Sequence, residues 1–522
     1  MSEARGADPG LLRRNAISNV VGRSASVLLW VLVTPVVLSR LGPERFAVWS
    51  LFLGLGGNVA TLDFGMGNAV ARHMALSAAH GDRPNLRLVL RRSLALSAGI
   101  GLLWCLASMA GRGVLIRAFH VPLPLQPEVS RSLLLFAVSM FVFSVTQVLT
   151  GALVGLQRLD LQNLCFLSGL ALHATVLLVG LSLGMGLIAI AFAAISGHML
   201  SGTLAALLVR RSMRNLHTGP PRERVTWREM LNFGGAVQGT AVCAVGQQQA
   251  WSYLLGALGQ LRWVTEFSLG YRVANAVWSL PTLVQGAVIP AAAHASASGD
   301  HDRVRTVYAW ACRWIFALGG LVLGGLWLTA PAVGVLWLGP QQVLAMAGSV
   351  TVVRLLAIAF AVATISGPAT AVARGGGWPL LETLNFAIAL AINVLMSVWL
   401  VPRMGPAGAA IAMGVSYGLA GAWLFVTMHR VLNVATGRWL WTLVLPRFAL
   451  PALAAGTLHM LWPMALPGSR MDALRILLLQ GGAYTLITAA LLWPTGDPAV
   501  LLSRLRAGHR TSSRDVPGEG HS

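Results

Sequence analysis

Long apolar runs dominate this chain and limit the folds open to it. Fourteen runs of roughly twenty residues follow one another, and about twenty residues is the length that crosses a bilayer core as a helix. Apolar residues make up 56% of the chain and charged residues 11%, whereas a soluble protein carries about 25% charged residues. The sequence therefore predicts an all-α polytopic membrane protein with about fourteen transmembrane helices.

The expected helices are separated by short polar loops. From the N-terminus they lie near 15–38, 46–68, 93–111, 132–156, 161–182, 187–209, 232–257, 264–290, 306–329, 346–373, 380–401, 405–429, 440–462 and 472–493.

Basic loops predict the orientation of these helices in the membrane. The net charge is +21 and every basic residue is an Arg, with the densest clusters at 72–92 and 210–228. Because short cytoplasmic loops collect Arg, this charge is better explained by topology than by nucleic acid, and we expect no nucleic-acid partner. Both termini are expected in the cytoplasm, residues 1–14 as a short N-terminus and 494–522 as a disordered tail.

Three pairs of similar segments, which we call echoes, predict an internal duplication. The pairs are LGPERFAVWSL at Leu41 with LGQLRWVTEFSL at Leu258, GDRPNLR at Gly81 with GDHDRVR at Gly299, and MGLIAIAFAAIS at Met185 with MGPAGAAIAMGVS at Met404. The offsets are 217, 218 and 219 in that order. An offset that drifts by single residues while the order is kept is what a duplicated unit produces.

The duplication predicts two six-helix halves followed by two extra helices. We expect an N-lobe at 15–209, a basic cytoplasmic linker at 210–231, a C-lobe at 232–430 and a final helix pair at 440–493. Because six is even, both halves enter the membrane the same way up, as a parallel repeat. Two such lobes typically hold a substrate between them and alternate its access. The alternative is a duplicated scaffold with no transport role.

Polar residues at helical spacing predict where a substrate would bind. They lie on the first and second helices, on their repeat equivalents, the seventh and eighth, and on the tenth. The candidate substrate-binding residues are Asn19, Arg23, Asn58, Gln249, Arg272, Asn275 and Arg354. Their clustering on symmetry-related helices predicts one hydrophilic cavity between the halves.

The charges on these helices favour an anionic substrate. Arg23 lies about ten residues into the first helix with no acid beside it, and a guanidinium fork matches a phosphate. Packing against neutral polar groups is the alternative for Arg23, and reaching the membrane surface is the alternative for Arg272 and Arg354. Asp63, Glu266 and Glu382 all lie near helix ends, so no acid is positioned to bind a cation at mid-depth.

No pattern in the sequence points to an enzyme. The chain has no HExxH, no P-loop, no GxSxG and no zinc-spaced Cys/His set, so no catalytic residue, metal or cofactor is expected. The four cysteines, Cys105, Cys165, Cys243 and Cys312, lie inside apolar runs and are expected to be core residues. A membrane glycosyltransferase or polymerase remains the alternative from another class, although the short loops leave little room for its chemistry.

Several segments resemble the polysaccharide flippases of the multidrug/oligosaccharidyl-lipid/polysaccharide exporter (MOP) superfamily, the Wzx-type O-antigen translocases. They are VLSRLGPERFAVWSLF, LDFGMGNAVAR, the basic stretch before the third helix, and MGPAGAAIAMGVS before the twelfth. The resemblance covers about residues 12–430. It implies two MATE-like lobes and movement of an undecaprenyl-diphosphate-linked oligosaccharide across the bacterial cytoplasmic membrane. By position, Arg23 matches the family's cavity Arg, and Arg272 and Arg354 match less closely.

Two other members of the superfamily are alternatives. Lipid II flippases share fourteen helices and a cationic cavity, whereas drug/cation antiporters usually have twelve helices and an acid in the first. If the chain is a polysaccharide flippase, the polymerase and chain-length machinery are its candidate protein partners. The resemblance names neither the glycan nor the source of energy.

Overall fold

The computed structural model describes residues 9–61, 66–79, 82–214, 227–463 and 465–492. Within these ranges every regular element is a helix. Ten helices in the described part of the chain are long and apolar enough to cross a membrane. The chain is therefore an integral multi-pass membrane protein, as the apolar runs predict.

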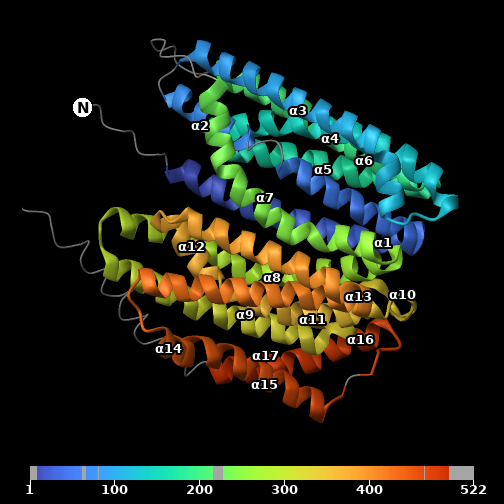
Figure 1. The fold of residues 1–522 in the computed structure, drawn as a ribbon, viewed down its shortest axis with the longest axis vertical. Coiled ribbons are helices and arrows are strands. Elements are labelled where there is room, and N and C mark those ends of the chain that lie inside the picture. The colour runs from blue at the N-terminus through green and yellow to red at the C-terminus, as the bar shows by residue number, and fades with distance from the viewer. Residues whose placement is uncertain (1–8, 62–65, 80–81, 215–226, 464, 493–522) are drawn as a thin grey trace, which may run out of the picture. The chain divides into compact units, whose positions relative to one another are not determined.

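The helices of the first half follow the expected spans (Figure 1). They are α1 (Pro9–Thr61), α2 (Met66–Ala79), α3 (Arg83–Ala118), the short 3₁₀ helix η1 (Leu123–Leu125), α4 (Gln126–Gly155), α5 (Leu159–Ser182) and α6 (Leu187–Arg214).

The second half and the C-terminal pair complete the chain. Their elements are α7 (Trp227–Leu258), α8 (Leu261–Ala297), α9 (His301–Leu338), α10 (Pro340–Ala345), α11 (Gly348–Thr364), α12 (Gly367–Gly376), α13 (Pro379–Val431), α14 (Thr436–Trp439), η2 (Leu440–Val444), α15 (Leu445–Leu461), α16 (Arg470–Ile476), η3 (Leu477–Gly481) and α17 (Gly482–Leu492).

Two of these helices each contain two expected spans. The backbone of α1 breaks at Gly42, where φ is 74°, and that of α13 breaks at Gly405, where φ is 58°. A proline follows each glycine and starts the next helix, where its missing N–H is not needed. With the halves of α1 and α13 counted separately, the described helices overlap all fourteen expected spans, although 62–65 of the second span lie outside the described residues and the tenth span is divided between α11 and α12.

The echoed sequences form matching local structures in the two halves. Asp82 caps α3 by accepting a hydrogen bond from the backbone N–H of Asn85 at 3.0 Å, and Asp300 caps α9 from the N–H of Arg303 at 2.9 Å. Gly186 and Gly405, at the third pair of echoes, both have φ of 58°. Cap and turn are thus repeated at the spacing that the sequence predicts, which supports the duplication.

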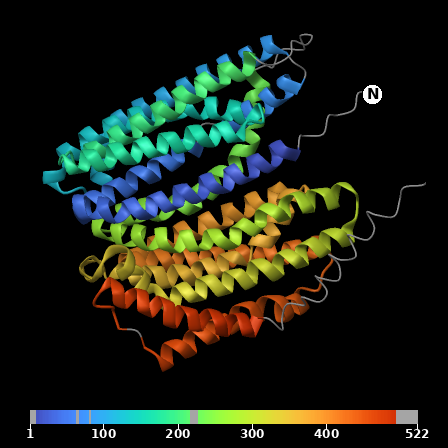
Figure 2. The same cartoon turned by 180° about the vertical axis from the view of Figure 1, so that it is seen from behind.

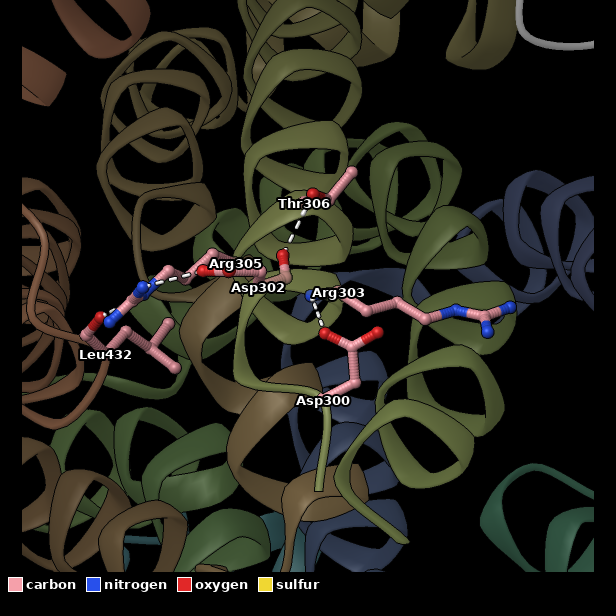
Figure 3. A network of polar contacts seen from close by, with 6 residues as sticks. All are labelled: Asp300, Asp302, Arg303, Arg305, Thr306 and Leu432. Carbon is pink, nitrogen blue, oxygen red and sulfur yellow. Dashed lines mark hydrogen bonds and ion pairs between the residues drawn. The ribbon is translucent and has the colours of Figure 1, made fainter. Parts of the chain in front are cut away.

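The Asp300 cap belongs to a larger polar network, shown in Figure 3. Arg305 contacts the Asp302 carboxylate at 2.8 Å, and its Nε donates to the carbonyl of Leu432 at 2.6 Å. Leu432 is the residue that ends α13. The network therefore joins the beginning of α9 to the end of α13 as well as capping α9.

The chain divides into two compact units. Unit 1 comprises 1–276, 346–356 and 380–420, and unit 2 comprises 277–345, 357–379 and 421–522. In unit 1, α4 packs against α3 and α6, and α5 packs against α6, as both views show (Figures 1 and 2). The apolar core beneath α2, α3 and α4 includes Met74, Leu86 and Leu153. The lobe boundaries expected from the sequence stay a prediction.

Unit 2 contains the C-terminal helices, where α15 and α16 pack on α9 and α17 packs on α15. Tyr484 of α17 is buried and its hydroxyl donates to the carbonyl of Gly320 on α9 at 3.1 Å. Arg447 is also buried, and its guanidinium donates to the carbonyls of Thr442 and Leu443 in the π-helical turn η2. A π-helical turn changes the backbone bonding of the helix, and Arg447 satisfies two of its carbonyls.

Candidate substrate-binding site

Two serines at equivalent positions of the repeat contact each other. Ser50, in the second half of α1, donates a hydrogen bond to Ser268 of α8 at 2.9 Å, and the two are 218 residues apart. Both belong to the first pair of echoes, and both are buried. In a duplicated chain whose copies are related by a twofold axis, equivalent residues contact each other where they lie on that axis. We therefore call the Ser50–Ser268 contact the repeat axis.

Arg272 lies one helical turn after Ser268, against the second half of α1. Its guanidinium carbon is 4.6 Å from the centroid of the Trp49 ring and 5.7 Å from that of Phe46. Both aromatic residues are fully buried. A guanidinium above an indole face is attracted by the ring's quadrupole, and this attraction strengthens away from water. The aromatic residues thus hold the cation beside the repeat axis.

The polar contacts of Arg272 are long and lead to hydroxyl groups. Its Nε is 3.5 Å from the Ser268 oxygen, and Nη1 is 3.5 Å from the Thr34 oxygen. Thr34 uses its own proton to donate to the carbonyl of Trp30 at 2.6 Å, so its oxygen faces the guanidinium as an acceptor. At 3.5 Å these hydrogen bonds are at the weak end of the range. Among the described residues, Arg272 therefore makes only weak hydrogen bonds.

No acid among the described residues forms an ion pair with Arg272. Two of the described acids pair with other arginines. Glu128 pairs with Arg45 at 2.8 Å and accepts from the backbone N–H of Leu187 at the start of α6, while Glu266 pairs with Arg262 at 3.4 Å. A guanidinium without a counter-ion inside a membrane protein is costly, and an anionic ligand would remove that cost.

Gln249 approaches the same part of α1 from α7. A Cβ atom added to Gly54 would lie 2.8 Å from the hydroxyl of Ser252 and 3.5 Å from the Gln249 side-chain oxygen. Gly54 is one turn beyond Ser50. Arg272 therefore contacts the second half of α1 at Phe46 and Trp49, and Gln249 approaches it at Gly54, within two helical turns. The structure therefore brings together two of the seven sequence-predicted residues.

The other sequence-predicted residues are placed less completely. Asn275 lies one turn after Arg272 on α8, and Arg354 lies in the first half of α11; both are half-buried. The side chains of Asn19, Arg23 and Asn58 lie outside the described part of the structure, as do Asp63, the linker residues 215–226 and the tail. The role predicted for Arg23 thus stays a prediction, and Arg272 is the residue whose surroundings are known.

Sequence patterns did not identify Trp49 and Phe46, the aromatic residues that hold Arg272. Both are apolar residues inside an apolar run, so helical spacing gave no reason to separate them from the core. The repeat contained a usable signal, because Ser50 and Ser268 end the first pair of echoes. Asking which equivalent residues of the two echoes could contact each other would have identified this region.

Comparison with known proteins gives one partial family match and several solved structures with the same fold. Residues 20–178 match the MatE family. No protein of curated function matches the chain by sequence. Among solved structures, an inward-facing multidrug resistance MATE transporter of the MOP superfamily superposes with a TM-score of 0.68 and 16% identity, covering 79% of this chain and 96% of that one.

Two further structures share the fold. The lipid II flippase MurJ in an inward closed conformation gives a TM-score of 0.69 at 11% identity, covering 90% of this chain and 98% of that one. A MOP transporter from Pyrococcus furiosus, described as having a binding pocket of reversed polarity, gives 0.62 at 18%, covering 81% and 95%. Two of these three structures are named as transporters and one as a flippase. The chain is thus an all-α membrane protein with a MatE match at 20–178 and the fold of MATE transporters and MurJ.

Proposed function

We propose that the protein is a flippase that moves an undecaprenyl-diphosphate-linked oligosaccharide, an O-antigen or exopolysaccharide repeat unit, across the cytoplasmic membrane. The observation that carries this proposal is Arg272. It is a cation beside the repeat axis, held by Trp49 and Phe46 with no acid of the described residues paired to it. The guanidinium of Arg272 favours an anionic cargo.

A diphosphate suits this site better than a simple carboxylate. Arg presents a planar fork of donors that can bind two phosphate oxygens at once. The serine and threonine hydroxyls beside Arg272 add neutral donors and acceptors without adding negative charge. We propose that Arg23 and Arg354 add further cationic charge, as their sequence positions predict.

The proposed mechanism is alternating access. The lipid diphosphate enters from the cytoplasmic leaflet, its head group binds at Arg272, and the two repeats then rock so that the site opens outward. The prenyl tail stays in the lipid throughout. Binding drives this change only by its difference in affinity between the two states. We place both termini in the cytoplasm of a bacterial cell, so that released glycan meets the polymerase and chain-length machinery outside.

A lipid II flippase is the second candidate, and the structural likeness to MurJ favours it. Its cargo has the same prenyl diphosphate, so Arg272 serves either function equally well. A drug/cation antiporter is the third candidate, suggested by the MatE match at 20–178. The charge of Arg272, with which no acid of the described residues pairs, argues against a cationic cargo, because two cations would repel each other inside the site.

Loss and restoration of the gene test the proposal. Deleting it in its native host should trap lipid-linked oligosaccharide in the inner leaflet and remove surface glycan. The wild-type gene should restore export, and Arg272→Ala and Arg23→Ala should not, at matched protein levels. Arg403→Ala is the matched control, because Arg403 also stacks on a tryptophan, at 4.8 Å from Trp399, but is exposed.

Each result has a clear meaning. If deletion traps peptidoglycan precursor instead, the lipid II alternative replaces the proposal. If deletion traps no lipid-linked precursor and sensitises the cell to cationic drugs, the antiporter alternative replaces it. If Arg272→Ala exports as well as Arg403→Ala does, the diphosphate does not bind at Arg272.

A further inference from the structure

A pocket of about 680 Å³ lies in unit 1 where four helices end or begin, and we call it the helix-end pocket. It is formed by the ends of α2, α4 and α6 and the start of α5. Ligand sites in proteins usually measure about 300–1,000 Å³, so this pocket is large enough to bind a ligand. Its lining includes Ala78, Leu156, Gln157, Arg158, Arg211 and Ser212.

The lining of the helix-end pocket is apolar on one part and cationic on another. Leu156, Leu161 and Leu208 line it and are half-buried, whereas Gln157 and Arg211 are exposed. None of the described residues that line the pocket is Asp or Glu. Such a lining fits an amphiphilic ligand that has an anionic group.

The charges at the pocket leave one positive charge for a ligand. Two nitrogens of Arg158 contact the two carboxylate oxygens of Asp160, at 3.1 and 3.2 Å. This bidentate pair fixes the guanidinium and balances its charge. Arg211 is exposed in the last turn of α6, and no acid of the described residues forms an ion pair with it. Two guanidiniums and one carboxylate thus match the single negative charge of a phosphodiester.

The second repeat contains a counterpart of this place. A Cβ added to Gly155 would collide with the carbonyl oxygen of Ala71, and a Cβ added to Gly375 would collide with that of Ile289. Ala71 and Ile289 are 218 residues apart, which is the offset of the second pair of echoes. The two close helix contacts are therefore equivalent, and so are the turns that follow them.

In the second repeat, the chain's own side chains occupy this place. Trp378 lies so close to Gly376 that an added Cβ would be 2.6 Å from its ring, and the Ser296 hydroxyl donates to the carbonyl of Gly376 at 3.1 Å. The first repeat has Arg158 in place of Trp378 and Ala78 in place of Ser296. It therefore lacks both the ring and the hydroxyl. A ligand that replaces them has an apolar part and a polar part.

The turn beside Arg158 keeps a polar side chain at a backbone cost. Gln157 has φ of 57°, a left-handed conformation that favours glycine, and its counterpart in the second repeat is Gly377, with φ of 92°. The first repeat thus has a side-chain amide where a glycine would be unstrained. An amide N–H next to guanidinium groups suits phosphate oxygens, which only accept hydrogen bonds.

The position of the pocket favours a membrane lipid over a free ion. Helices α4, α5 and α6 are long and apolar enough to cross a membrane, and the pocket lies at their ends, where lipid head groups would be. Basic pockets between transmembrane helices are suited to anionic head groups. The predicted orientation places this end of unit 1 at the cytoplasmic leaflet.

We propose that the helix-end pocket binds the head group of an anionic phospholipid. The phosphodiester contacts Arg158 and Arg211. The glycerol and the first acyl carbons lie against Leu156, Leu161 and Leu208. This lipid is a membrane component and not the cargo, so the inference does not depend on the proposed flippase function. A soluble phosphate has the same anionic chemistry without the apolar part, and the test separates the two.

Native mass spectrometry of the purified full-length protein tests the proposal. The protein in detergent is titrated with phosphatidylglycerol or with phosphatidylcholine, which has the same phosphate and an added cation. Wild type should bind its first phosphatidylglycerol at least about tenfold more tightly than phosphatidylcholine. Arg211→Gln should lower the affinity for phosphatidylglycerol about fivefold or more, because one cation is lost. Arg158→Trp should abolish the preference, because it copies the residue of the second repeat.

Arg210→Gln is the matched control. Arg210 is the neighbour of Arg211 at the same end of α6 and is also exposed, but it is not among the described residues that line the pocket. This variant should bind phosphatidylglycerol within about twofold of wild type, because only the general surface charge changes. Both Arg210 and Arg211 are on the surface, so the comparison does not depend on a core substitution.

A second measurement uses only the wild-type protein in nanodiscs. Phosphatidylglycerol that carries a diazirine near its head group should label residues 155–161 or 208–212. Unlabelled phosphatidylglycerol should compete with this labelling, and an excess of inorganic phosphate should not. This measurement keeps the proposal testable if Arg158→Trp does not fold.

Three results would overturn the inference. Equal affinity of wild type for the two lipids would show that the pocket does not select an anion. Equal losses in Arg210→Gln and Arg211→Gln, or labelling confined to other segments, would show general attraction to a basic surface. Labelling that inorganic phosphate removes would make the ligand a soluble phosphate. None of these results bears on transport, so the flippase proposal is tested separately.

Discussion

The two repeats use the same place in the fold differently. In the first repeat, Trp30 and His198 line a cavity of about 540 Å³, which we call the first-repeat cavity. At the offsets of 217 and 219, the second repeat has Gln247 in place of Trp30 and Tyr417 in place of His198. Gln247 is fully buried, and its side chain donates to Ser416 at 2.9 Å and accepts from Asn393 at 3.2 Å. Where the first repeat leaves a space, the second has a closed network.

This difference shows how a duplicated fold can divide its tasks. In the second repeat, Ser397 also donates to Asn393 at 3.2 Å, so the network bonds most of its own polar atoms. A buried network that is satisfied internally makes the surrounding helices rigid and leaves nothing for a ligand. In the first repeat, the buried nitrogens Nε1 of Trp49 and Nε2 of His173 have no hydrogen-bond partner among the described residues. The two repeats thus differ in how completely this region bonds its own polar atoms.

The two repeats also differ in charge at the position of Arg272. Arg272 belongs to the second repeat, and the residue at the equivalent position of the first, at the offset of 218, is Gly54. The bulky guanidinium packs on Trp49, whereas Gly54 allows Ser252 of α7 to approach closely. One repeat thus supplies the charge and the other the aromatic face that holds it.

The largest expected effect comes from removing that charge. Arg272→Ala should lower the affinity for undecaprenyl diphosphate by roughly a hundredfold, about 3 kcal/mol, because a desolvated ionic contact is lost. Arg272→Lys should recover part of this affinity, since it keeps the charge and loses the fork. Titration in nanodiscs measures both. Equal affinity in all three proteins would show that the charge of Arg272 has no part in binding.

Breaking the closed network should reduce stability next most strongly. Asn393→Leu leaves the Gln247 side-chain oxygen without its donor, which should cost about 2–3 kcal/mol. The double variant Gln247→Leu with Asn393→Leu should be more stable than Asn393→Leu alone, because it removes both partners. Thermal unfolding in detergent measures the order of the three proteins. A double variant less stable than both single variants would contradict the network account.

Gly197→Ala tests the close helix contact that forms the floor of the first-repeat cavity. The new Cβ would lie 2.7 Å from the carbonyl oxygen of Gly169 and 2.9 Å from the Cβ of His173. We expect a loss of stability of about 1–3 kcal/mol, because α5 and α6 must move apart. The equivalent residue of the second repeat is Ser416, which already has a Cβ, so Ser416→Ala adds no atom between helices. It should instead cost about 2–3 kcal/mol, because it removes the hydrogen bonds with Gln247 and with the carbonyl of Met413. A Gly197→Ala protein as stable as wild type would contradict the close contact.

The smallest expected effect concerns the serines on the axis. Ser268→Ala removes one hydrogen bond with Ser50 and should cost about 1 kcal/mol. A double-mutant cycle with Ser50→Ala should give a coupling energy of about 0.5 kcal/mol or more, since the two hydroxyls bond each other. Additive losses in thermal unfolding would mean that the pair does not hold the axis together.

The fold was predictable from the sequence because its signals are local. Apolar runs of membrane length predicted the all-helical membrane fold, and the Gly-Asp starts of α3 and α9 predicted two matching caps. The parallel duplication followed from the order of the echoes. Each of these features depends on residues close together in the chain, where spacing alone carries the information.

The site was predictable only in part, because its contacts join distant segments. Polar spacing identified Arg272 and Gln249, but the packing of Arg272 on Trp49 joins residues more than two hundred positions apart. The first-repeat cavity escaped notice for the same reason. Its polar residues, Gln147, His173 and His198, are single residues on three helices, and only their shared neighbours in the fold show that they line one cavity.

The most direct test of the account is transport by the purified protein in vesicles. A fluorescent undecaprenyl-diphosphate disaccharide is placed in both leaflets, and a sugar-modifying reagent outside reports how much reaches the outer leaflet. The account predicts that wild-type protein exposes the inner pool, that Arg272→Ala does so at roughly a hundredth of the rate, and that Arg403→Ala matches wild type. Exposure no faster than in protein-free vesicles, with folded wild-type protein, would contradict the flippase proposal.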